Sequence, residues 1–239
     1  MPGTVAAMSK LPLTPQHVPA IVPVLLGIVA GFVDAVTFLG LFGFFVAQVT
    51  GSYVFVGAGV VAPGALGVTA LLAVPVFFLS GVAAVMVAAA ASAAGARPLV
   101  WTMLLECVLL AAMVAASLLG APFAAEEEPW AIATALIGLA TMGAQATQVR
   151  ALMQGVPSTN VMTANTAQLA VDLVQAIFAR GEATAPFYGR LIATLRVMAG
   201  FLAGTIAGAL MFAALGFVAL IAPLAVLAAL AIWAMMSAQ

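Results

Sequence analysis

Two short polar segments interrupt an otherwise apolar chain, and they contain residue types that could bind a solute. The first is Val49-Thr50-Gly51-Ser52-Tyr53, and the second is Met162-Thr163-Ala164-Asn165-Thr166. Such residues are typical of helix starts, because Thr, Ser and Asn cap free N–H groups and Gly allows a turn. The start of a short helix is positive and suits anionic groups. Each segment therefore predicts a broken helix that binds a solute or, alternatively, only caps itself.

Single acidic side chains lie inside two of the apolar stretches. Asp34 follows Gly31-Phe32-Val33, and Glu106 lies in the middle of the stretch 99–119. A carboxylate within a membrane-spanning segment is costly, so it normally faces a cavity or a partner. Asp34 is therefore a candidate for solute binding or proton coupling, unless it is hydrated at the end of its helix. Glu106 is a candidate coupling residue or a neutral acid hydrogen-bonded to another helix.

Other polar residues in the apolar stretches extend the candidate set. Gln145 and Gln148 lie near the counterpart of Asp34 in an internal repeat, and they either bind solute or hold helices together. Asp172 is expected to form a structural ion pair with Arg190 or Arg196. The predicted solute-binding residues are Asp34, Thr50, Gly51, Ser52, Gln145, Gln148, Thr163 and Asn165, with Glu106 as the coupling candidate.

The composition excludes several classes of protein. Hydrophobic residues make up 66% of the chain and charged residues 5%, against about 25% charged in a globular domain. The bilayer must therefore be its solvent. The net charge of -1 offers no basic field for nucleic acid, and the lone His17 and Cys107 offer no metal cage or disulfide framework. No nucleophile elbow, Walker loop or HExxH motif is present, so we expect no enzyme, no cofactor and no bound metal.

The spacing of the apolar stretches predicts an all-α polytopic membrane protein, since about 20 residues suffice to cross. The stretches run over residues 18–42, 44–62, 66–94, 99–119, 130–149, 158–178, 191–215 and 217–236. We expect a soluble N-terminal arm at 1–17, a first membrane repeat at 18–120, an acidic loop at 121–129 and a second membrane repeat at 130–239. A polar connection is predicted at 179–189.

An internal repeat is visible in the order of the motifs. Residues 31–43 match residues 143–155, the two polar segments match each other, and residues 78–84 match residues 201–207. If both polar segments are re-entrant, the basic residues share one face, which the positive-inside rule makes cytoplasmic. The two halves are then inverted, and the polar segments meet near the midplane. The alternative is eight crossings with the basic charges divided. The basic residues counted are Lys10, Arg97, Arg150, Arg180 and Arg190.

A family resemblance follows from these motifs. Gly31-Phe32-Val33-Asp34-Ala35 and Thr50-Gly51-Ser52 resemble the first half of the YoaK family of bacterial inner-membrane proteins. Met142-Gly143-Ala144-Gln145, with Arg150 and Thr163, resembles its second half. The family tends to have Asn in place of Ser52 and Gly in place of Ala164. The resemblance implies a polytopic membrane protein of unassigned activity.

Together these features predict a secondary transporter or exporter of a small solute, with an anionic solute favoured by the positive helix starts. A passive channel and a non-transporting scaffold or accessory subunit are the alternatives. The expected location is the bacterial inner membrane, with the N-terminus cytoplasmic. Gly200, Gly204 and Gly208 form a small-residue face for close packing, either within the chain or in a homodimer.

Overall fold

The computed structural model describes residues 13, 15–62, 67–178 and 185–237. These residues form helices and loops, with one isolated bridge between Gln16 and Met153, so the predicted all-α class is confirmed. The elements in chain order are α2 (Ile21–Gly40), α3 (Thr50–Gly59), α4 (Val68–Ala93), α5 (Pro98–Gly120), α6 (Pro129–Leu152), α7 (Met162–Phe178), α8 (Ala185–Leu215), the 3-10 helix η3 (Gly216–Leu220) and α9 (Ile221–Met236).

The helix boundaries follow the apolar stretches, with one correction. Residues 185–189 were predicted to be part of a polar connection, but they form the beginning of α8. Pro186 is compatible with this start, because the first turn of a helix has free N–H groups and tolerates the fixed φ of proline. The other residues of that predicted connection, 179–184, and most of the predicted N-terminal arm lie outside the described residues.

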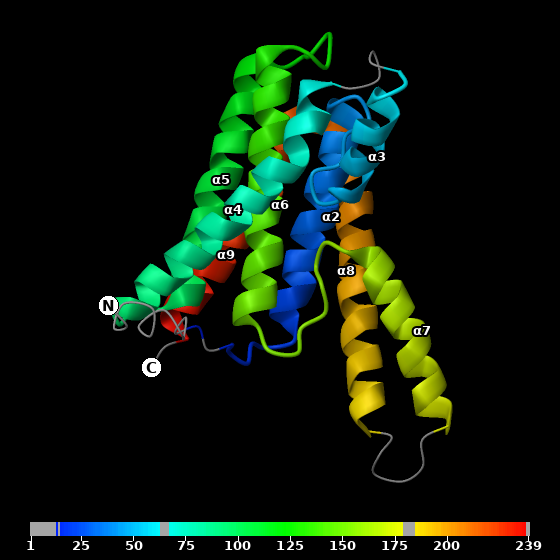
Figure 1. Cartoon of the computed structure of the whole chain (residues 1–239). Helices are drawn as coiled ribbons and strands as arrows, with labels where there is room; N and C mark the ends of the chain where they lie inside the picture. Colours follow the sequence, from blue (N-terminus) through cyan, green and yellow to red (C-terminus); the bar gives the residue numbers. More distant parts are fainter. Residues whose placement is uncertain (1–12, 14, 63–66, 179–184, 238–239) are drawn as a thin grey trace, which may run out of the picture.

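Five apolar helical stretches among the described residues are long enough to cross a membrane. They are α2, α4, α5, α6 and the continuous stretch Ala185–Met236, which contains α8, η3 and α9. The chain turns at η3, where Gly216 has a positive φ of 57°, and α9 returns along the bundle (Figure 1). By contrast, α3 has only 10 residues and is about 15 Å long.

Glycines allow two helix pairs to approach very closely. A Cβ atom added at Gly31 of α2 would lie 2.1 Å from the carbonyl oxygen of Phe201 in α8. One added at Gly143 of α6 would lie 2.5 Å from the carbonyl oxygen of Phe77 in α4. The glycines of α8 contribute to the same contact, since a Cβ at Gly204 would lie 2.1 Å from the carbonyl oxygen of Ile28. The small-residue face of α8 is therefore used within the chain, against α2.

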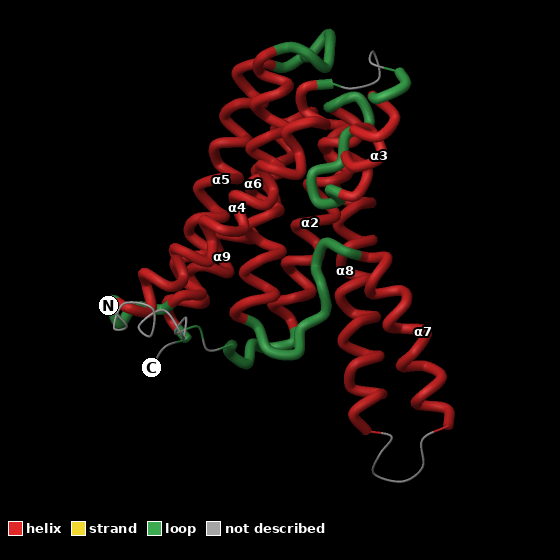
Figure 2. Tube along the Cα trace, in the orientation of Figure 1, coloured by secondary structure: helices red, strands yellow, loops and turns green. Residues whose placement is uncertain are grey.

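The two short helices lie beside opposite ends of the bundle. Helix α3 packs against α4 next to the end at which α2 finishes, whereas α7 packs against the first half of α8 (Figure 1). The loop that follows α6 returns along the bundle before α7 begins (Figure 2). Each short helix is thus preceded by an irregular segment that packs against longer helices.

The charged connections are divided between the two ends of the bundle. Arg97 precedes α5 and donates hydrogen bonds to the carbonyl oxygens of Ala234 and Met235 at the end of α9. Arg150 lies in the last turn of α6, which finishes at this same end. The acidic loop between α5 and α6 is at the opposite end (Figure 1). Lys10 and Arg180 lie outside the described residues.

The position of α5 leads to a test of topology. Ala96 precedes this helix and Glu127 follows it, so a helix that crosses the membrane places them on opposite sides. In a Cys107→Ala background, single cysteines at these two positions should react with an impermeant thiol reagent from opposite sides of sealed vesicles. Reaction of both cysteines from one side would contradict the crossing of α5.

The glycine contacts lead to a test of packing. Gly31→Ala places a methyl group against the backbone carbonyl of Phe201 in α8. A backbone atom cannot rotate away as the end of a side chain can, so overpacking should cost about 1–3 kcal/mol. The thermal unfolding midpoint of the purified protein should fall. Gly57→Ala in α3 is the matched control, because nothing lies within 4 Å of its added Cβ. Equal unfolding midpoints for the two variants would contradict the close approach of α2 to the backbone of α8.

Candidate functional site

Asp34 holds the irregular segment that precedes α3. Its side chain is buried, with 3% of its surface exposed, so the hydrated alternative is wrong. The Oδ1 atom accepts hydrogen bonds from the backbone amides of Val46 at 2.9 Å and Ala47 at 2.7 Å. The Oδ2 atom accepts only a long hydrogen bond, 3.4 Å, from the side-chain amide of Gln48. One carboxylate oxygen is therefore fully used, and the other has capacity for a further donor.

The start of α3 differs from the predicted capping arrangement. The N-cap residue is Val49, and its side chain forms no capping hydrogen bond. Thr50 and Gly51 are exposed, whereas Ser52 is buried. The local-capping alternative is therefore wrong for this segment, because the residue that binds the amides before α3 comes from α2.

Gln145 of α6 plays a comparable part before α7. Its side-chain nitrogen donates to the carbonyl oxygen of Leu26 at 3.0 Å and to Thr159 Oγ1 at 2.9 Å. The side chain of Asn160 in turn donates to the carbonyl oxygen of Met142 in α6. A buried side chain of a long helix thus fixes the segment that leads into α7.

Of the two predicted residues in the second polar segment, one is buried and the other is exposed. Asn165 is buried and donates to the carbonyl oxygen of Ser158 at 2.6 Å, while Thr163 is exposed. Among the described residues, no hydrogen bond joins either of them to Thr50, Gly51 or Ser52. A shared central site for both polar segments therefore stays a prediction.

Gln148 and Glu106 form a buried pair between α6 and α5. The side-chain nitrogen of Gln148 donates to Glu106 Oε2. Both side chains are fully buried, and Glu106 Oε1 and Gln148 Oε1 have no hydrogen-bond partner among the described residues. Glu106 therefore forms the predicted hydrogen bond to another helix. Its role as a proton-coupling residue stays a prediction.

The segment 45–53 contributes to the walls of two pockets. One pocket of about 250 Å³ lies against α2 and α8 and is lined by Asp34, Phe38, Phe45, Gln48, Phe201 and Thr205. The other, of about 550 Å³, lies against α4 and α6 and is lined by Val49, Tyr53, Phe77, Phe78 and Thr147. Of the predicted first polar segment, Val49 and Tyr53 line the larger of these pockets. The smaller pocket is lined by Phe45 and Gln48, which precede that segment, and Thr50, Gly51 and Ser52 line neither of the two.

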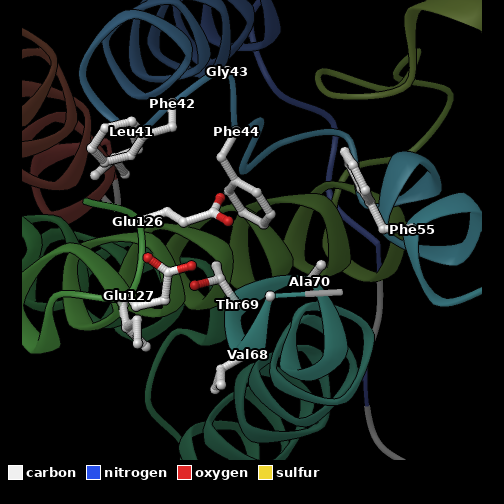
Figure 3. A pocket seen from close by; sticks show the side chains of 12 residues that line it. Leu41, Phe42, Gly43, Phe44, Phe55, Val68, Thr69, Ala70, Glu126 and Glu127 are labelled. Carbon is white, nitrogen blue, oxygen red and sulfur yellow. The ribbon is translucent and has the colours of Figure 1, made fainter. Parts of the chain in front are cut away.

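A third, much smaller pocket lies at the end of the bundle near the acidic loop. Its volume is about 70 Å³, and Glu126, Glu127 and Thr69 direct their oxygen atoms into it opposite Phe44 (Figure 3). Both glutamates are exposed to solvent. This cluster is consistent with the hydrated acidic loop predicted from the sequence.

The predicted ion pair of Asp172 is confirmed, with Arg190 as its partner. Arg190 Nη2 lies 2.6 Å from Asp172 Oδ1, and the aspartate is fully buried. The hydrogen bond from Arg190 holds the pKa of the Asp172 carboxyl below its ordinary value. The pair links α7 to the beginning of α8, so its role is structural.

Sequence reasoning did not identify several residues that hold the irregular segments. Gln48 contacts Asp34, and the side chains of Ser158, Thr159 and Asn160 organise the start of α7. A signal was present for the second group, because Ser158-Thr159-Asn160 is a polar run directly before a helix. No local pattern predicted that Asp34 and Gln145 would bind backbone or side chains of a following loop.

Long apolar helices around buried polar side chains define this protein as a multi-pass integral membrane protein. A family model described as "Protein of unknown function (DUF1275)" matches residues 22–233. The chain therefore belongs to this family, which is the family of YoaK-like proteins. No curated protein and no solved structure matches the chain.

The contacts of Asp34 lead to a pair of substitutions. Asp34→Ala leaves two buried amides unpaired, at about 1–3 kcal/mol each, and should lower the thermal unfolding midpoint strongly. Asp34→Asn keeps an oxygen acceptor of the same shape, so the protein should retain most of its stability. Equal destabilisation by both variants would show that the negative charge of Asp34, rather than its acceptor oxygen, holds the loop.

Proposed function

We propose that this protein is a secondary transporter or exporter of a small solute, built from two inverted repeats with the solute site beside segment 45–53. We place it in the bacterial inner membrane with its N-terminus in the cytoplasm. The observation that carries the proposal is that helices of one half pack against helices of the other half. Helix α2 of the first half packs against α8 of the second, and α6 of the second packs against α4 of the first.

Two sets of contacts support the repeat. Gly31 of α2 approaches the carbonyl of Phe201 in α8, and Gly143 of α6 approaches the carbonyl of Phe77 in α4. In addition, Asp34 binds the loop 12 to 14 residues after it, and Gln145 binds the loop 14 and 15 residues after it. Equivalent contacts in both halves are what a duplicated and inverted unit would produce.

The irregular segments support a transport role. Within a membrane, backbone that is not helical is tolerated only where it is buried in protein or lines a cavity. Segment 45–53 borders two pockets, one against α2 and α8 and one against α4 and α6. Because these helices belong to different halves, a movement of one half against the other would change access to both pockets.

Glu106 is the residue that we propose for coupling to protons. It is fully buried and accepts a hydrogen bond from Gln148 of the neighbouring helix, and its other carboxylate oxygen has no partner in the part of the chain that the structure describes. A purely structural scaffold does not require an unpaired buried acid or pockets beside an irregular helix start. A scaffold and a channel would each respond differently from a transporter to thiol labelling at the proposed site.

Alternating access can be tested without knowing the solute. In a Cys107→Ala background, a cysteine at Gln48 should react slowly with an impermeant thiol reagent from either side of sealed vesicles, because each conformation exposes the site to one side. The same vesicles should show no steady ion conductance. Cysteines at Ala96 and Glu127 serve as one-sided controls.

The possible results separate the three functions. Reaction of the Gln48 cysteine from both sides together with steady conductance would identify a channel. Reaction from one side only, or from neither side, would contradict transport and support the scaffold.

A further inference from the structure

We propose that the pocket beside Asp34 binds an amphipathic organic cation, an amine that carries an aromatic or similarly sized apolar group. This inference rests on the proposed function, since it names the class of solute for the same site. It concerns the pocket of about 250 Å³ between α2, α8 and the segment before α3.

The walls of this pocket are apolar and largely aromatic. Phe38 and Phe45 stack with their ring centroids 4.9 Å apart, and Phe201 closes the side formed by α8. Aromatic faces bind apolar groups and also attract cations through the negative potential above the ring. A strongly hydrated inorganic ion would gain little from such walls, whereas an organic ammonium ion would gain from both effects.

The single formal charge in the lining is negative. Of the residues that line this pocket, Asp34 is the only ionisable one, and Gln48 and Thr205 are the other polar ones. The amides of Val46 and Ala47 are already bound by Asp34 Oδ1, so they are not free for an anion. Asp34 Oδ2 has only the 3.4 Å contact with Gln48, which leaves it able to accept a hydrogen bond from an ammonium group.

This arrangement points to a different charge from the one favoured by the sequence. The positive end of a short helix suggested an anionic solute, but the carboxylate of Asp34 lies beside that helix start and would repel an anion. A cation instead offsets a charge that is costly to bury alone. The charge of Asp34 therefore decides the preference of this pocket.

The pocket opens toward the apolar surface of the molecule. The exposed fractions of Phe38, Leu39 and Phe45 are 45%, 50% and 41%, and all three residues line the pocket. In the conformation of this structure, a ligand that reaches Asp34 by this route passes through the lipid-facing surface, whereas the water-facing access tested at Gln48 would open in the alternating conformations. Such a route requires an apolar body, in agreement with the aromatic walls.

Three probes of similar size and different charge test this inference: phenethylamine, 2-phenylethanol and 3-phenylpropanoate. With the full-length protein in nanodiscs, we expect phenethylamine to raise the thermal unfolding midpoint most. 2-Phenylethanol should have a smaller effect and 3-phenylpropanoate none. Equal shifts with the amine and the alcohol, a largest shift with the carboxylate, or no shift with any probe would each overturn the inference.

Three variants link the effect to this pocket. Asp34→Asn should weaken phenethylamine binding about tenfold or more, because it removes a charged hydrogen-bond partner, and should leave the alcohol unchanged. Ala209→Phe fills the pocket while keeping the carboxylate, so it should abolish the effect of both probes even if Asp34→Asn does not fold. Asp172→Asn removes an acid that does not line the pocket, and the amine shift should remain.

The outcomes are distinguishable from those of the transport test. If Asp172→Asn abolishes the amine shift as fully as Asp34→Asn, or if Ala209→Phe keeps it, binding occurs elsewhere and the inference is wrong. Two-sided reaction of the Gln48 cysteine depends on access and not on the charge of the probe. Transport would therefore stand even if the amine were not the preferred ligand.

Discussion

The structure depends on the pairing of backbone groups where the chain is not helical. The bilayer core contains no water that could bind a free N–H group, and each unpaired group costs several kcal/mol. The segment before α3 meets this requirement through Asp34, and the segment before α7 is tied to α6 through Gln145. These buried side chains fix the irregular segments against the long helices, so that the short helices begin beside them.

The second constraint is the close approach of helices from different halves. Lipid chains are as apolar as leucine side chains, so helices in a membrane associate through close packing and polar contacts rather than through the hydrophobic effect. Gly31 and Gly204 bring α2 and α8 together, while Gly81 and Gly143 do the same for α4 and α6. The two halves also contact each other where α5 packs against α6 and α9. Segment 45–53 lines one pocket beside the α2–α8 contact and one beside the α4–α6 contact.

Buried polar groups outside the helix starts divide into paired and partly paired ones. Asp172 is bound by Arg190 and by Gln168, so its charge is compensated and its role is structural. Within the described ranges, fully buried Glu106 is bound by Gln148 through one oxygen, and its other oxygen has no partner. Asp34 is intermediate, because Oδ1 accepts two hydrogen bonds, Oδ2 accepts one long one, and the residue lines a pocket. This difference in pairing separates the residues that hold the fold from those proposed to act on a solute or a proton.

The sequence by itself determined the class of the protein and the positions of its helices, because hydrophobicity and segment length are local properties of the chain. It also identified Asp34, Glu106, Gln145 and Gln148 as unusual, since polar side chains in apolar stretches are costly. Only the tertiary structure decided their partners, because the hydrogen bonds from Val46 to Asp34, from Gln145 to Thr159 and from Gln148 to Glu106 join separate elements. The surroundings of the first short helix were also a tertiary result. Its start favours an anion when it is considered alone, and only the folded chain places the carboxylate of Asp34 from α2 against the segment before it.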